Sequence, residues 1–174
     1  MGLSVLMIIL FFIIFAGNLY SSTITVSSNS ASWDRTKEVL VLKGNVVLKR
    51  GPLTLKAPIV QLKGQIDKPE KIIASGGVFV LDKERNAKIK AETIEVFPLE
   101  KKAICKGDVS INYQGRIISA KSGYYEGIKN IAKLTGSCTL EEEGKYFEGD
   151  IIKYFLDEER IELEGSVKGS LLVK

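Results

Sequence analysis

A glycine-centred pattern that recurs about every 30 residues is the sequence feature that most constrains the fold. The glycines are Gly44, Gly76, Gly107, Gly136 and Gly165, at intervals of 32, 31, 29 and 29 residues. In the four complete copies, the positions two and four residues to either side of the glycine carry apolar or small side chains, as in LVLKGNVVL. This alternation predicts a β-strand with one buried face. A glycine on that buried face predicts a kink or bulge in the middle of the strand.

A second alternating segment follows each of the first four glycines, and a small residue interrupts it. The small residues are Ala57, Ala91, Ala120 and Gly149, which lie 13 to 15 residues after the preceding glycine. The alternation shifts by one position across each of them, which predicts a further bulge or corner. No segment shows sustained helical periodicity. The sequence therefore predicts an all-β fold of stacked antiparallel strand repeats, each of about 30 residues.

The chain begins with a strongly apolar segment. Residues 3–16 are almost entirely hydrocarbon, and the run is shorter than the roughly 20 residues that a membrane-spanning helix needs. This length is typical of the apolar region of a signal peptide. We therefore expect residues 1–22 to be a signal peptide and residues 23–174 to form the exported β-domain. An uncleaved membrane anchor is the alternative, because the apolar stretch can be extended to Tyr20.

The composition argues against an enzyme. The chain has no histidine, which excludes Ser-His-Asp triads, Cys-His pairs and histidine metal sites. The carboxylates at 141–143 and 157–159 lie in hydrophilic, turn-like segments, and no Asp-x-Asp calcium loop is present. We expect no catalytic residue, no cofactor and no metal. A net charge of +4 is too small to indicate nucleic-acid binding.

The two cysteines are expected to be free thiols. Cys105 lies two residues before its glycine, and Cys138 lies two residues after the next one. If the copies stack in register, this offset separates them by roughly 13 Å at 3.3 Å per residue. A disulfide requires Cα atoms within about 7 Å of each other.

Several segments resemble a known family. Gly-Asn-Val-Val at 44–47, Leu-Thr-Leu-Lys-Ala at 53–57 and Gly-Asp-Val at 107–109 are similar to the OstA-like repeat. Residues 24–29, with Trp33, Asp34 and Lys37, resemble the start of the lipopolysaccharide transport protein A (LptA) family. The resemblance implies an OstA-like β-jelly-roll in the periplasm, open along one side and at both ends. The copies at 76–78 and 136–138 depart from the Gly-Asn-Val pattern.

The resemblance also implies a function. Members of the family bind the acyl chains of lipid A inside the roll and join head to tail. The resulting bridge connects an inner-membrane extractor to an outer-membrane translocon, both of which contain related β-jelly-rolls. We therefore expect a periplasmic protein that carries lipopolysaccharide from the inner to the outer membrane and contributes to outer-membrane assembly. Two alternatives stay open: a membrane-anchored component similar to protein C of the same pathway, and a structural envelope protein with a self-packed interior.

The inward apolar positions are the candidate lipid-binding groove, although each one taken alone can equally be ordinary core. These positions are Leu48, Leu55, Leu62, Val78, Val80, Ile89, Ile94, Val96, Val109, Ile111, Ile118, Tyr125, Leu140 and Phe147.

The two ends of an open sheet expose unpaired backbone groups that can pair with another strand. We expect one such edge near residues 23–26, with Ile24 and Val26, and the other in residues 166–173, with Val167, Leu171 and Val173. Pairing of one edge with the other generates an open head-to-tail filament.

Overall fold

The structure, a computed structural model, describes residues 23–113, 115–158 and 160–172. These residues form a 12-stranded antiparallel sheet. The strands are β1 (Thr25–Ser27), β2 (Ser30–Asp34), β3 (Val39–Arg50), β4 (Leu53–Gly64), β5 (Pro69–Asp82), β6 (Ala87–Phe97), β7 (Lys102–Tyr113), β8 (Arg116–Glu126), β9 (Ile131–Glu142), β10 (Lys145–Phe155), β11 (Arg160–Glu164) and β12 (Lys168–Leu171). The expected signal peptide at 1–22 and the edge residue Val173 lie outside the described residues.

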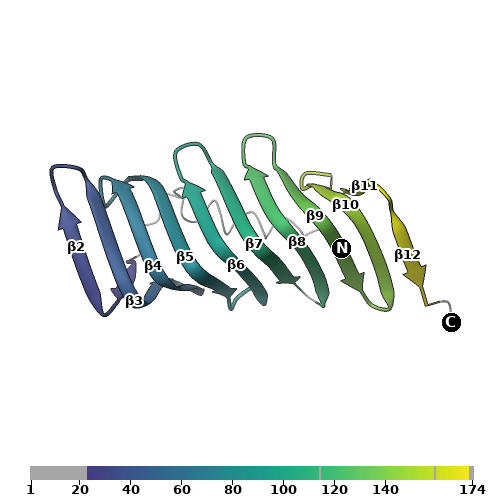
Figure 1. Ribbon diagram of the computed structural model, residues 1–174, viewed down its shortest axis with the longest axis horizontal. Coiled ribbons are helices and arrows are strands. Elements are labelled where there is room, and N and C mark those ends of the chain that lie inside the picture. Colours follow the sequence, from purple (N-terminus) through teal and green to yellow (C-terminus); the bar gives the residue numbers. More distant parts are fainter. Residues whose placement is uncertain (1–22, 114, 159, 173–174) are drawn as a thin grey trace.

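The sheet is open at both ends. From β3 to β10 each strand pairs with the next one in sequence, so the strands follow one another along the long axis of the molecule (Figure 1). Within the described residues, the first strands do not pair with the last ones. The expected all-β class, an open β-jelly-roll of stacked antiparallel repeats, is confirmed. No helix in these residues is long and apolar enough to cross a membrane.

Each end of the sheet is a single strand broken into two pieces. β1 pairs with Val47–Lys49 of β3, and β2 pairs with the earlier half of the same strand. In the same way, β11 and β12 pair with the two halves of β10. Both edges are therefore longer than the sequence indicated. The N-terminal edge continues to Asp34, and the C-terminal edge begins at Arg160.

The predicted central bulges are present. In β3 the pairing register shifts between Lys43 and Val46, where Gly44 (φ +75°) and Asn45 (φ +48°) are left-handed. The same pair of left-handed residues recurs at 76–77, 107–108, 136–137 and 165–166. The even-numbered strands shift their pairing register directly opposite these bulges, as β4 does between Lys56 and Ile59. The bulges thus align across the sheet, and every long strand bends at its middle.

Glycine is required at the bulges for two reasons: the backbone angles are left-handed, and the neighbouring strand approaches too closely for a side chain. A Cβ atom added to Gly107 would lie 2.5 Å from the Cβ atom of Glu92 on β6. A Cβ atom on Gly44 would lie 2.9 Å from that of Asn29, whose backbone amide donates a 2.8 Å hydrogen bond to the Gly44 carbonyl oxygen. The neighbouring strand therefore occupies the space that a side chain would need.

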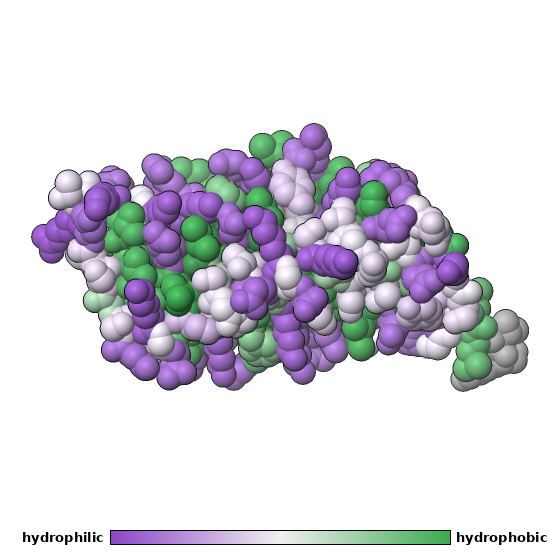
Figure 2. Space-filling model, in the orientation of Figure 1, coloured by the Kyte–Doolittle hydropathy of each residue, from purple (hydrophilic) through white to green (hydrophobic). Residues whose placement is uncertain are grey.

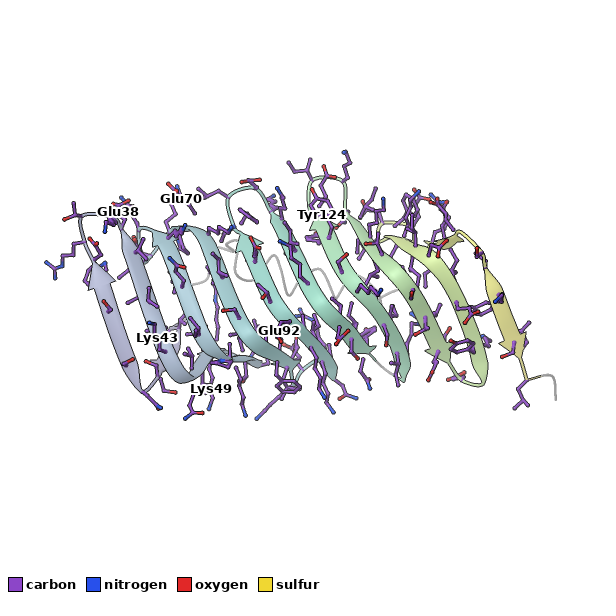
Figure 3. The ribbon with its side chains drawn as sticks, viewed as in Figure 1. Glu38, Lys43, Lys49, Glu70, Glu92 and Tyr124 are labelled. Atoms are coloured by element: carbon purple, nitrogen blue, oxygen red, sulfur yellow. The ribbon has the colours of Figure 1, made fainter. Side chains whose placement is uncertain are left out.

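The bends divide the sheet into two half-sheets. The upper half-sheet runs from the bends to the turns at 35–38, 65–68, 98–101 and 127–130, and the lower one runs to the turns at 51–52, 83–86 and 143–144. Figure 3 shows Glu38 and Glu70 at the upper border and Lys49 at the lower border. Both half-sheets contribute to one hydrophobic core, as Leu42 and Val46 do from either side of the bend in β3. The described core residues all lie between positions 40 and 163, so residues 23–174 contain this core.

Gly107→Ala should destabilise the protein more than Gly115→Ala. Both positions have similar left-handed angles (φ +76° and +82°), so both substitutions pay a similar backbone cost. Nothing lies within 4 Å of a Cβ atom on Gly115, whereas one on Gly107 meets Glu92. The free energy of unfolding of Gly107→Ala should therefore be lower by an additional ~1–3 kcal/mol in chemical denaturation. Equal losses for the two variants would contradict this explanation of the bend.

Candidate functional site

The inward side chains of the lower half-sheet form one continuous row. Each member is paired with the next one across neighbouring strands from β3 to β10. The row consists of Leu48, Leu55, Val80, Ile89, Ile111, Ile118, Leu140 and Phe147. All of them are candidate groove residues from the sequence, so the structure brings these eight together on one face.

The other candidate residues lie in the upper half-sheet or at the bend. Leu62, Val96 and Tyr125 belong to one row of the upper half-sheet, and Ile94 belongs to a second. Val78 and Val109 lie beside the bends, opposite Ala91 and Ala120. All candidate groove residues belong to the hydrophobic core or pack against it, and only Leu62, Ile111 and Phe147 are not fully buried.

The candidate set omitted several residues of the same face. These residues are Leu42, Val60, Ile72, Leu134, Ile152 and Tyr154, which fill the two upper rows. They show the same period-two alternation in the sequence as the candidate groove residues. They therefore extend the candidate face without changing its chemistry, because all except Tyr154 are purely aliphatic.

The interior is filled mainly by its own side chains. Val60, Cys138 and Ile152 have no exposed surface. A cavity of about 40 Å³ remains where small residues such as Ala103, Gly123 and Ala132 meet. That volume has room for about three water molecules, which is far too little for an acyl chain. A chain-like ligand can enter only if the half-sheets separate or the side chains repack.

Both cysteines are buried free thiols, as the sequence predicted. Burial raises the pKa of the Cys105 thiol to about 12. Burial is also the main cause that raises the pKa of Cys138. Because the thiolate is the nucleophilic form, both groups are inert at neutral pH and act as small core residues.

A partly charged row borders the apolar interior in the lower half-sheet. Arg50, Asp82, Arg116, Glu142 and Lys145 lie at the next inward position beyond the lower apolar row. They share this position with Leu53, Ala87 and Tyr113. Asp82 is buried, and its carboxylate accepts a 2.8 Å hydrogen bond from the guanidinium of the turn residue Arg85. Arg116 forms an ion pair with Glu142. An apolar interior next to a charged border has the chemistry to hold an amphiphile.

The described residues bring together no group of three or more side chains that could ligate a metal ion.

The sheet edges carry exposed apolar side chains. Ile24 and Val26 at the N-terminal edge, and Val167 and Leu171 at the C-terminal edge, are each about half exposed or more. Figure 2 shows hydrophobic atoms at the C-terminal tip, beside the grey residues. Trp33, for which the sequence indicated no edge role, lies at the end of an upper inward row with the Arg35 guanidinium 4.6 Å from its ring centre. Its exposure shows that the inward face is uncovered at this end.

One family model matches most of the chain. Residues 25–160 match the family described as "LptA/(LptD N-terminal domain) LPS transport protein". Among solved structures, the chain is similar to LptH from Pseudomonas aeruginosa, which is described as the LptA homologous periplasmic component of the lipopolysaccharide transport device. The identity is 18%, the TM-score is 0.38, and the match covers 87% of this chain and 96% of that one. No curated protein matches the chain.

Proposed function

The chain belongs to the family of LptA and LptD N-terminal-domain lipopolysaccharide transport proteins, and we propose that it carries lipopolysaccharide through the periplasm as one unit of a head-to-tail bridge. The acyl chains of lipid A would lie between the two half-sheets, and the sugar and phosphate groups would stay at the charged border. The partners would be further copies of this chain and related β-jelly-rolls at the inner and outer membranes.

The continuous inward rows support this proposal. Each methylene moved out of water contributes about 0.8 kcal/mol, so several acyl chains can be held strongly. Because the rows run unbroken from β3 to β10, a chain that moves along them exchanges one aliphatic neighbour for another. Such a path holds a lipid and still lets it advance, as transport requires.

The packed interior favours the competing hypothesis of a structural envelope protein with no ligand. Core residues such as Ile94 are almost completely buried among other side chains. Under the transport hypothesis, lipid must replace these contacts. The aligned bends and the unjoined ends of the sheet make such a separation feasible without breaking strand pairs.

A photo-crosslinking amino acid at position 94 should form an adduct with lipopolysaccharide under ultraviolet light. Ile94 faces the interior, whereas its neighbour Thr93 faces the opposite side of the same strand and is the matched control. Immunoblotting with an antibody against lipopolysaccharide should detect an adduct at position 94 and none at 93. Adducts to protein alone at position 94 would support the structural hypothesis.

The strand count supports head-to-tail extension. Because β1–β2 and β11–β12 each correspond to one bent strand, the twelve strands make ten bent strands. With an even number, the last strand runs opposite to the first. The first strand of a second copy can therefore continue the antiparallel alternation, with β1 beside β12 and β2 beside β11.

Continuation of the internal register gives a specific joint. Each row of paired residues would run from one copy into the next, so that Ile161 would meet Trp33 of the second copy on the inward face. On the outward face Arg160 would lie opposite Asp34, and Glu164 would lie opposite Ser30. Apolar residues thus meet on the inside of the joint, and one pair of opposite charges, Arg160 and Asp34, meets on its outside.

A disulfide should form between copies that carry Glu164→Cys and copies that carry Ser30→Cys. Directly opposed residues have Cα atoms about 4.5–5.5 Å apart, within disulfide range. Glu162→Cys combined with Ser30→Cys is the control, because a displacement of two residues puts the pair outside this range. Non-reducing gel electrophoresis should show covalent dimers for the first pair only. Equal yields would contradict the register, and a chain that stays monomeric in light scattering at high concentration would contradict the bridge itself.

A further inference from the structure

The outward face of the lower half-sheet over β3–β6 is basic and contains no acidic residue. Side chains at its outward positions alternate with buried residues such as Leu48, Leu55 and Val80. The outward residues are Val47, Lys49, Thr54, Lys56, Phe79, Leu81, Lys88 and Lys90. We call this set the basic face. Of the nearest carboxylates, Asp82 bonds Arg85 on the inward side, and Glu92 lies beyond the face at the bend, with its Cβ atom over Gly107.

Lysines surround apolar side chains on the basic face. Lys56 and Lys90 lie directly opposite Phe79 on its two neighbouring strands, and Lys88 lies opposite Leu81. Within the part of the chain that the structure describes, none of the four lysines of this face forms an ion pair. Their charges are therefore available to an external anionic partner.

The outward face of the upper half-sheet provides an internal contrast. There Glu95 accepts hydrogen bonds from Lys71 at 2.7 Å and Lys106 at 3.2 Å. The Lys71 hydrogen bond is the main cause that lowers the pKa of Glu95, so the carboxylate is charged and offsets both lysines. The positive charge of the upper face is thus partly satisfied within the protein, whereas that of the basic face is not.

We infer that the basic face docks on the surface of an anionic phospholipid membrane. Its four lysines stand on β3, β4 and β6, on both sides of the apolar residues of β5, and do not converge on one point. That arrangement suits a plane of phosphate headgroups better than a single small anion. The amphipathic lysine stems and the half-buried Phe79 ring between them are also compatible with a headgroup layer.

The position of β1 fits the same partner. The apolar segment at residues 3–16 joins the fold through β1, and Thr25 of β1 pairs with Lys49. A retained anchor would therefore emerge next to the basic face, and after cleavage the face alone would hold the roll reversibly at the membrane. This contact uses neither the inward face nor the sheet edges, so docking leaves lipid transfer and filament growth unobstructed.

The test is flotation of residues 23–174, which contain the whole described core, with lipid vesicles at low ionic strength. The chain should float with vesicles of phosphatidylcholine and phosphatidylglycerol and remain unbound with phosphatidylcholine alone. Each lysine near an anionic surface strengthens binding about fivefold, so Lys56→Glu with Lys90→Glu should weaken binding by roughly 25-fold or more. Circular dichroism should show that the variant is folded, because the substitutions remove repulsion between like charges.

The matched control is Lys43→Glu with Lys63→Glu, which makes the same change in net charge on the outward face of the upper half-sheet (Figure 3 labels Lys43). Vesicle binding by this variant should stay within a few-fold of the unmodified chain. An equal loss of vesicle binding in both variants would show that net charge alone determines binding and would overturn the inference. Unchanged vesicle binding in both variants would also overturn it. Displacement of the unmodified chain by inorganic phosphate at constant ionic strength would show a discrete anion site and would also overturn it.

Discussion

The architecture depends on pairs of left-handed residues placed at the same level in alternate strands. At Gly107 and Asp108, as at the four equivalent pairs, the backbone turns while the side chain of the adjacent strand fills the space that the glycine leaves open. Because the bulges are aligned, the whole sheet bends along one line and the pairing continues on both sides of it. The inward residues before and after the bend then share one core, and no covering helix is needed.

Alignment of the bends also gives continuous apolar rows, and this continuity links the fold to transport. A lipid held between the half-sheets would meet a similar apolar surface on every strand, so no single pocket would trap it. The packed interior opposes lipid binding, because the small cavity beside Gly123 cannot hold an acyl chain. Transport by this roll therefore requires that lipid burial offset the loss of contacts between the half-sheets.

The strands and bends were predictable because each repeats one signal: alternation with a period of two, a central glycine and turn residues between segments. The eight-residue lower row could be chosen from the sequence for the same reason. The edges were less predictable. β2 contains serines in place of an apolar alternation, so the sequence did not indicate that Trp33 belongs to an inward row. At the other edge, the bend at Gly165 divides the final strand into two short pieces. The buried pairing of Asp82 with Arg85 depends on a turn geometry that composition does not specify.

Separation of the half-sheets around lipid is the central physical requirement, and a distance measurement tests it directly. Spin labels at Glu84 in a lower turn and Leu99 in an upper turn would report the distance between the two borders by pulsed electron paramagnetic resonance. Both positions are exposed, so labelling should not disturb the core. Addition of lipopolysaccharide should shift the distance distribution to larger values, and lipopolysaccharide stripped of its acyl chains should not. An unchanged distribution under saturating lipopolysaccharide would contradict binding between the half-sheets.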